Sequence, residues 1–319
     1  MNYRQLGSTD LTVSEIGFGA WGIGGSANGA LGYGPTDPEE SDLALRTAFD
    51  RGINFFDTSD LYGFGNSEKV IGRSLKNVRK EIILATKVGF LDANHAQDFS
   101  SEYIRTSIEG SLKRLETDYV DLYQLHSPPL EALRNDPRIL PTMESLRKEG
   151  KIREFSISVD SPNDGAAAIN EFGFKCVQAN LNMADQRALD NGLLSLCVQK
   201  NVGFIARTPL SFGFLTGHYS STDSFHPQDH RGKWKTEQLD RWAGAFQLFE
   251  GAVADRSGQT QAQIALRFCL SCPGVTTTIP GMLTEQHVTE NSRASELGPL
   301  TETEMQRFAE IYHGNTLFA

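Results

Sequence analysis

The chain has 319 residues, a formal net charge of −10 and 39% hydrophobic residues. This length is sufficient for a sizeable core, and the composition excludes a collagen-like or disordered protein. The acidic balance argues against nucleic acid or an anionic membrane as the main partner. Because no charged-then-apolar leader and no apolar run of about 18 residues is visible, we expect a soluble cytoplasmic protein.

Short apolar runs alternate with amphipathic stretches along the chain, after a β-hairpin predicted at residues 3–13. The predicted strands are residues 16–19, 54–57, 82–86, 120–125, 153–157, 176–179, 203–206 and 275–279. The predicted helices are residues 39–51, 67–75, 101–115, 141–149, 163–172, 191–199, 239–255, 261–271, 284–294 and 301–312. Asn66 or Ser67 is the expected N-cap of the second helix, and Thr301 with Glu304 that of the last.

Eight β/α units with short connections predict an α/β protein with a single (β/α)8 TIM barrel, an N-terminal β-hairpin and an extra C-terminal helix. No segment rich in Pro, Gly and Ser divides the chain, so residues 1–319 are expected to form one domain. A Rossmann fold is disfavoured, because no G-x-G-x-x-G opens a helix after the first strand.

The four cysteines do not form a disulfide framework for a chain of this length. Cys269 and Cys272 have the spacing of a redox or metal motif, but they lie in an apolar helical stretch, so core packing is the preferred interpretation. No metal site is expected, because the histidines lack a close pattern of partner ligands.

Three predicted strands end in an ionisable residue: Asp57, Lys87 and His126, with Tyr62 one loop after the first. Each residue alone has an ordinary explanation, as a helix cap, a solvated lysine or a satisfied histidine. In a parallel barrel, however, the carboxyl ends of all strands open onto one face, so these four side chains are predicted to converge there.

The chemistry of this set is specific. An ammonium group beside a phenol stabilises the phenolate, and a carboxylate paired to the lysine holds the ammonium in place. A histidine on the same rim can donate a hydrogen bond to a carbonyl oxygen. Together these groups predict a proton-donating site for a carbonyl that receives a hydride.

At these residues the chain resembles the aldo-keto reductase superfamily over essentially its whole length. The matching motifs are Asn54-Phe55-Phe56-Asp57-Thr58 with Tyr62-Gly63, Ala85-Thr86-Lys87, Asp121-Leu122-Tyr123 with Leu125-His126, Pro209-Leu210 through Gly217, and Pro280-Gly281 with Glu290-Asn291. The resemblance implies Tyr62 as general acid/base, Asp57 and Lys87 as its tuning pair, and His126 as the residue that orients the carbonyl. It also implies a nicotinamide cofactor that lies extended across the barrel mouth.

The resemblance also assigns cofactor contacts and a preference for NADP(H) over NAD(H). The candidate cofactor-binding residues are Ala20, Trp21, Ser158, Gln178, Arg207, Pro209, Leu210, Ser211, Gly213, Gly217, Gly281, Thr284, His287, Glu290 and Asn291. Two positions depart from the family pattern, with Val159 where asparagine is frequent and Arg207 where an aromatic residue commonly stacks on the nicotinamide. Near the expected 2′-phosphate no lysine or arginine directly follows Gly281; Thr284, His287 or Arg293 would have to serve.

The insertion at residues 218–235 is basic within an acidic protein. It is either a solvated surface loop or a lid over cofactor and substrate. Trp21, Phe90 and Trp234 are candidates for the walls of the pocket, although core packing explains them equally well.

The sequence therefore predicts an NAD(P)(H)-dependent enzyme that reduces an aldehyde or ketone, with Tyr62 as the proton donor. A sugar-like carbonyl compound is one candidate substrate. One alternative is a sugar or alcohol dehydrogenase that works oxidatively. Another, from a different class, is a nicotinamide-binding regulatory subunit, since some members of the superfamily act as channel subunits. The expected partner is a small carbonyl or alcohol substrate, with no nucleic acid or membrane, and the choice between monomer and homo-oligomer is open.

Overall fold

The structure is a computed structural model that describes residues 1–94, 96–220, 222–315 and 317. Eight parallel strands form one sheet in which each strand is hydrogen-bonded to its neighbours in chain order. These strands are β3 (Phe18–Gly19), β4 (Phe55–Asp57), β5 (Ile83–Val88), β6 (Val120–His126), β7 (Ile152–Ser158), β8 (Cys176–Asn180), β9 (Gly203–Arg207) and β10 (Val275–Thr278).

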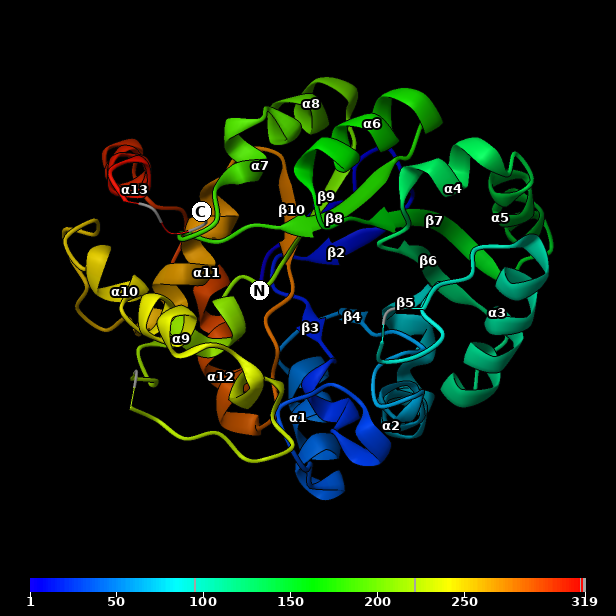
Figure 1. The fold of residues 1–319 in the computed structure, drawn as a ribbon, viewed down its shortest axis with the longest axis horizontal. Helices are drawn as coiled ribbons and strands as arrows, with labels where there is room; N and C mark the ends of the chain where they lie inside the picture. The colour runs from blue at the N-terminus through cyan, green and yellow to red at the C-terminus, as the bar shows by residue number, and fades with distance from the viewer. Residues whose placement is uncertain (95, 221, 316, 318–319) are drawn as a thin grey trace.

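The first and last strands meet and close the sheet. Parallel bridges join Ile16 to Thr278 and Gly19 to Gly281, and the amide of Gly17 donates to the carbonyl of Thr278 at 2.8 Å. Figure 1 shows the helices arranged around this ring of strands. The predicted (β/α)8 barrel is confirmed.

Most helices lie close to the predicted ranges, with short additional helices at α4 and α7. Their bounds are α1 (Pro38–Asp50), α2 (Asn66–Leu75), α3 (Ser101–Leu115), α4 (Leu130–Asn135), α5 (Ile139–Lys148), α6 (Pro162–Phe172), α7 (Arg187–Asp190), α8 (Leu193–Lys200), α9 (Thr236–Ala243), α10 (Ala245–Leu248), α11 (Gln261–Ser271), α12 (Glu285–Ser292) and α13 (Glu302–His313). The predicted capping box of Thr301 and Glu304 is present at α13.

Two local predictions were wrong. The N-cap of α2 is Gly65 in a left-handed conformation, because Asn66 and Ser67 use their side chains to donate to the carbonyls of Gly24 and Ala20 instead. These bonds tie α2 to the loop after β3. The single helix predicted at 239–255 is divided at Gly244 into α9 and α10 and ends at Leu248.

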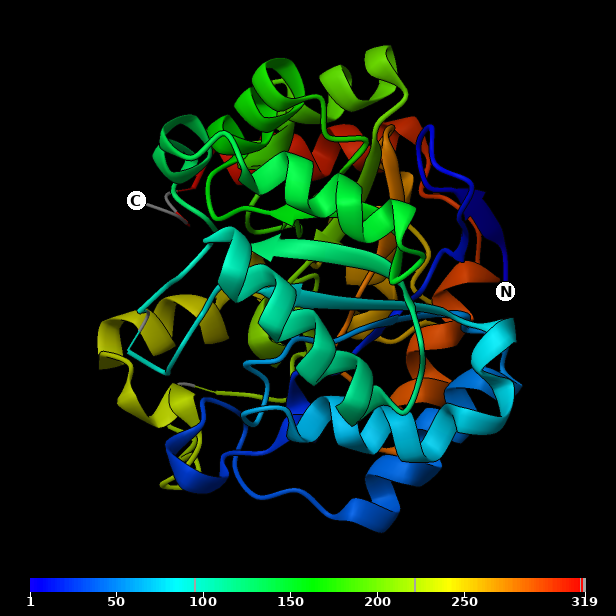
Figure 2. The same ribbon diagram turned by 90° about the vertical axis from the view of Figure 1, so that its right-hand side faces the viewer.

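The predicted N-terminal hairpin is also confirmed, as β1 (Tyr3–Gln5) and β2 (Thr12–Ser14). Its buried residues Leu6, Leu11 and Val13 pack against the inward-facing side chains of the barrel strands. At Gly7, with φ +57°, a Cβ would come within 2.2 Å of the amide nitrogen of Gly203, so this close approach requires glycine. The hairpin thus covers the amino-terminal end of the barrel, opposite α9 and α10 (Figure 2).

The four cysteines are buried and none forms a disulfide. The thiol of Cys269 donates to the carbonyl of Leu181 at 3.3 Å, and burial raises the pKa of this thiol to about 12. The interpretation of Cys269 and Cys272 as core residues is confirmed. Within the described residues, no helix combines the length and apolar character needed to cross a membrane.

Candidate active site

The register of the central strands brings the predicted catalytic side chains to the carboxyl-terminal mouth of the barrel. Asp57 ends β4, Lys87 lies near the end of β5, and His126 ends β6. Tyr62 follows in the turn that connects β4 to α2. Asp57, Tyr62 and His126 line a cavity of about 790 Å³, and Lys87 lies fully buried behind them.

The ammonium group of Lys87 has three acceptors, one for each of its hydrogens. Its Nζ lies 2.5 Å from Oδ1 of Asp57, 2.9 Å from the carbonyl oxygen of Thr58 and 3.2 Å from the hydroxyl of Tyr62. Burial lowers the pKa of Lys87, but the negative charges of Asp57 and of an ionised Tyr62 outweigh it, so the pKa is raised. The site therefore presents a fixed positive charge to the phenol oxygen.

The carboxylate of Asp57 is held from its other side by two amides. Gln124 on β6 and Gln178 on β8 each donate to Oδ2, at 2.8 and 2.9 Å. A buried carboxylate with a cation and two amide donors has its acceptor capacity met, which fixes its orientation. Gln124 and Gln178 thus hold Asp57, and Asp57 in turn holds the ammonium of Lys87 beside Tyr62.

The ring of His126 lies beside the ring of Tyr62. Its ring contacts Tyr62 edge-on at 6.0 Å between centroids and Phe90 at 4.8 Å. Burial, with the positive charges of Lys87 and Arg207, holds the pKa of His126 well below its usual range, so the imidazole is neutral at neutral pH. Its Nδ1 lies 3.2 Å from Oγ of Ser59, which leaves Nε2 for a ligand.

The predicted cofactor-binding residues fall into two groups. Those that line the same cavity are Ala20, Trp21, Gln178, Arg207, Pro209, Leu210, Gly213, Gly281, His287 and Asn291. Those that are not among its lining residues are Ser158, Ser211, Gly217, Thr284 and Glu290. Thr284 instead caps α12 by accepting from the amide of His287, and the roles of both groups toward a cofactor stay predictions.

Three of these residues already have protein partners. The hydroxyl of Ser158 lies 3.4 Å from Oε1 of Gln178, so the two residues predicted to hold a carboxamide are joined to each other. Arg207 pairs with Asp160 at 2.5 Å and donates to the carbonyl of Val159 at 3.1 Å. Its buried Nε has no partner among the described residues and is a donor that a ligand could engage.

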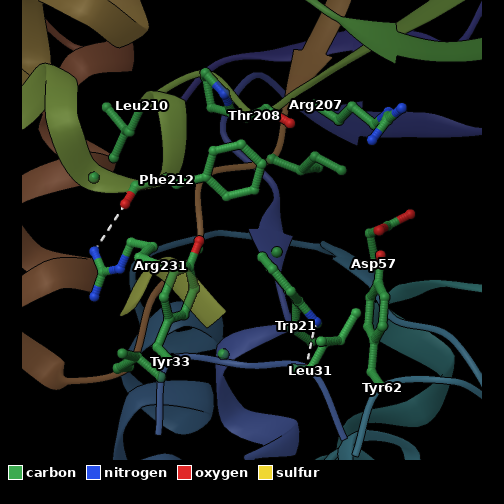
Figure 3. A pocket seen from close by; sticks show the side chains of 18 of the residues that line it. Trp21, Leu31, Tyr33, Asp57, Tyr62, Arg207, Thr208, Leu210, Phe212 and Arg231 are labelled. Carbon is green, nitrogen blue, oxygen red and sulfur yellow. Dashed lines mark hydrogen bonds between the residues drawn. The ribbon is translucent and has the colours of Figure 1, made fainter. Parts of the chain in front are cut away.

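Part of the cavity wall lies outside the residues singled out from the sequence. Of the pocket-wall candidates Trp21, Phe90 and Trp234, only the first two line it. Lining residues that were not predicted include Leu31, Tyr33, Thr208 and Phe212, several of which surround Trp21 in Figure 3. Their position in the glycine-rich loop after β3 and in the loop after β9 is the sequence feature that could have identified them as lining residues. Tyr219 and Arg231, which also line the cavity, belong to the 218–235 insertion, for which a lid was one of the two interpretations.

The 218–235 segment is fastened to the barrel through buried charged groups. The side chain of Arg231 pairs with Asp229 at 2.7 Å and donates to the carbonyl of Phe212 at 2.9 Å. Its guanidinium lies over the rings of Tyr33 and Tyr219, at 4.7 and 4.5 Å. Residues 229–231 are buried, so this part of the segment is not a solvated loop.

The same segment is joined to the glycine-rich loop that follows β3. The amide of His230 donates to the carbonyl of Gly32 at 3.0 Å, and Tyr33 and Asp229 form an antiparallel bridge. The ring of His230 contacts Trp21 at 4.7 Å between centroids. Two loops that are distant in sequence thus form one wall of the cavity.

We expect an Arg231→Ala variant to bind nicotinamide cofactor and substrate at least about tenfold more weakly, equivalent to about 1.4 kcal/mol. The truncation leaves Asp229 without its guanidinium and releases Phe212 and the two tyrosine rings that line the cavity. Fluorescence titration measures the change, with exposed Lys233→Ala as the control for lost charge. Equal affinities in the wild type and Arg231→Ala would contradict a lid role.

The fold and the site together define a parallel α/β barrel with a buried lysine–aspartate pair set against a tyrosine at its mouth. Comparison with known proteins agrees, because the model of the Aldo/keto reductase family matches residues 15–313. The chain therefore belongs to the aldo/keto reductase family, and the resemblance inferred from the sequence is confirmed.

Individual relatives span nearly the full chain. It is 30% identical over 310 residues to the uncharacterized oxidoreductase YqkF of Bacillus subtilis, covering 96% of this chain and 95% of the relative. It is 31% identical to the aldo-keto reductase yakc [NADP(+)] of Schizosaccharomyces pombe, covering 90% and 85%. The solved structure of aldo-keto reductase AKR11C1 from Bacillus halodurans, in its holo form, has a TM-score of 0.79 at 29% identity, covering 98% and 96%.

Proposed function

We propose that this protein reduces an aldehyde or ketone, including polar, sugar-like carbonyl compounds, to the alcohol with a nicotinamide cofactor, and that Tyr62 is the proton donor. The observation that carries the proposal is the buried ammonium of Lys87, held between Asp57 and the hydroxyl of Tyr62, two residues that line the cavity.

The residues of the chain divide the chemistry between them. Tyr62 accepts one hydrogen bond from Lys87, so its own O–H is directed to another acceptor, which in the reaction is the carbonyl oxygen. As the proton leaves, the adjacent ammonium stabilises the phenolate, and solvent later returns the proton. His126, neutral and beside Tyr62, donates from Nε2 to the same oxygen and orients it.

The residues around the cavity fit a nicotinamide dinucleotide, which when bound would supply the hydride. A Cβ at Gly281 would meet nothing within 4 Å, so the backbone there is open to an extended ligand. The Nε of Arg207, which has no partner among the described residues, and the amide group of Asn291 are further donors near this wall. Gly281, Gln286 and His287, at or near the amino terminus of α12, also line the cavity.

We propose that NADP(H) is preferred over NAD(H). A relative is named for NADP(+), and a helix amino terminus favours an added phosphate. Burial lowers the pKa of His287, although Glu290 and Glu40 act in the opposite direction, so its ring would bind a phosphate as a neutral hydrogen-bonding group.

Titration of the purified protein with NADPH and NADH, followed by absorbance assays with aldehydes, aldoses and ketosugars, tests the proposal. We expect tighter binding of NADPH and carbonyl-dependent oxidation of the nicotinamide. A preference of tenfold or more for NADH would contradict the NADP(H) assignment. Binding of neither nucleotide would contradict the proposed function itself.

A further inference from the structure

A chain of hydrogen-bonding side chains that are not among the residues lining the cavity adjoins His126. Oγ of Ser59 lies 3.2 Å from Nδ1 of His126 and 3.2 Å from Oδ1 of Asp60. The other oxygen of Asp60 accepts from the hydroxyl of Ser107 on α3 at 2.8 Å. Neither Ser59 nor Asp60 has a part in the proton transfer proposed above.

The hydrogen count on Ser59 makes this chain directional. A serine hydroxyl has one hydrogen and two lone pairs. One lone pair accepts from the amide of Leu61 at 3.2 Å. Of the two remaining neighbours, His126 and Asp60, one must therefore donate to Ser59 and the other must accept from it.

We propose that Asp60 is a positioning residue that sets the tautomer of His126 through Ser59. When Asp60 carries a proton, it donates to Ser59, Ser59 donates to Nδ1, and the ring hydrogen is on Nε2, facing the cavity. When Asp60 is ionised, Ser59 donates to the carboxylate, Nδ1–H donates to Ser59, and Nε2 is a bare acceptor. Between the two states, one proton is exchanged with solvent and the hydrogens of the chain each move by one position.

The surroundings of Asp60 place this change in the neutral range. Burial and the negative charge of Glu68 on α2 raise the pKa of Asp60 to about 7, against the hydrogen bonds from Ser107 and Ser59 and the charge of Arg114. Glu68 is itself paired with Arg114 at 2.6 Å. The other titratable groups near Asp60 are Tyr103 on α3 and Tyr123 on β6, and the pKa of each phenol is raised, by burial first and by Asp60 second.

The ring of His126 itself stays neutral through this range. Burial and the charges of Lys87 and Arg207 keep its pKa well below the usual range. A change of tautomer, rather than a change of charge, is therefore the response of His126 to the state of Asp60.

The consequence for activity rests on the proposed function. A carbonyl oxygen accepts hydrogen bonds, so it is oriented only by the tautomer with hydrogen on Nε2. Carbonyl reduction should fall as pH rises through the ionisation of Asp60. An Asp60→Asn variant, whose amide can donate to Ser59 and still accept from Ser107 at every pH, should keep its reductase activity across that range.

The tautomer itself can be observed without any substrate. Nitrogen-15 NMR of histidine-labelled protein at pH 5.5 and 8.5, with the signals of His126 assigned by their loss in His126→Asn, reports which ring nitrogen carries the hydrogen. We expect hydrogen on Nε2 at pH 5.5 and on Nδ1 at pH 8.5 in the wild type, and on Nε2 at both values in Asp60→Asn. Exposed Asp50→Asn on α1 is the control for lost charge and should follow the wild type.

The same tautomer at both pH values in the wild type would overturn the proposal, as would a folded Asp60→Asn that switches like the wild type. If Asp60→Asn does not fold, Ser59→Ala replaces it, and a tautomer that still follows pH without the hydroxyl would overturn the relay. Absence of turnover with every carbonyl would contradict the proposed function and leave this NMR test intact. The second readout is kcat against pH, in which only Asp60→Asn should lose the fall near pH 7.

Discussion

Replacing Tyr62 by phenylalanine is expected to lower kcat for carbonyl reduction by about 10²- to 10⁴-fold, the usual contribution of a general acid. The ring, with its contacts to Trp21 and His126, stays in place. Only the hydroxyl that bonds to Lys87 is lost. Nicotinamide affinity should therefore be nearly unchanged.

Single-turnover kinetics with saturating nucleotide measure this effect on the chemical step. The matched control is Tyr3→Phe, which removes an exposed tyrosine hydroxyl bonded to the carbonyl of Gly52, at the opposite end of the barrel. A Tyr62→Phe enzyme with wild-type turnover would remove Tyr62 from the role of proton donor.

Replacing Lys87 by methionine is expected to lower the free energy of unfolding by about 3–5 kcal/mol, the usual cost of removing one partner of a buried ion pair. Lys87 is fully buried and Asp57 is only 2% exposed, so the variant leaves a carboxylate in the barrel without its cation. The amides of Gln124 and Gln178 hydrogen-bond that carboxylate but do not neutralise it.

Urea unfolding at pH 7 measures the loss, and a double variant identifies its cause. Lys87→Met combined with Asp57→Asn should recover part of the stability, because the uncompensated charge is then removed. The surface pair of Lys76 and Glu116 provides the control, and Lys76→Met should change stability by no more than about 1 kcal/mol. A double variant less stable than the single one would show that the charge of Asp57 is not the source of the loss.

The convergence of the four predicted side chains at the barrel mouth was predictable from the sequence because short-range rules fix it. In a parallel barrel the carboxyl ends of all strands open onto the same mouth, so Asp57, Lys87 and His126, at or next to the ends of their strands, could be placed together. The hairpin and the capping box at Thr301 follow from equally local patterns. Tyr62, which lies in a loop, was placed in the site by the motif that begins at Asn54.

The wall formed by the two long loops was not predictable in the same way. Tyr33 and Arg231 lie about 200 positions apart in the sequence, and their contact depends on how both loops fold back over the barrel. The chain Ser59–Asp60–Ser107 was missed for a related reason, since its third member lies on α3. At α2, the side chains of Asn66 and Ser67 satisfied tertiary carbonyls instead of capping the helix, which no local rule reveals.

The seam between β3 and β10 has a consequence for how the chain is made. Residues 16–19 are synthesised well before their partners at residues 278–281. Until then the growing sheet has two unpaired edges, each a template for pairing with other chains. The hydrogen bonds from the side chain of Arg4 to the carbonyls of Leu270 and Val275 likewise form only after those residues have been synthesised. A nascent chain that stalls before about residue 275 should therefore depend on chaperones, whereas the finished ring, in the part of the chain that the structure describes, leaves neither β3 nor β10 unpaired.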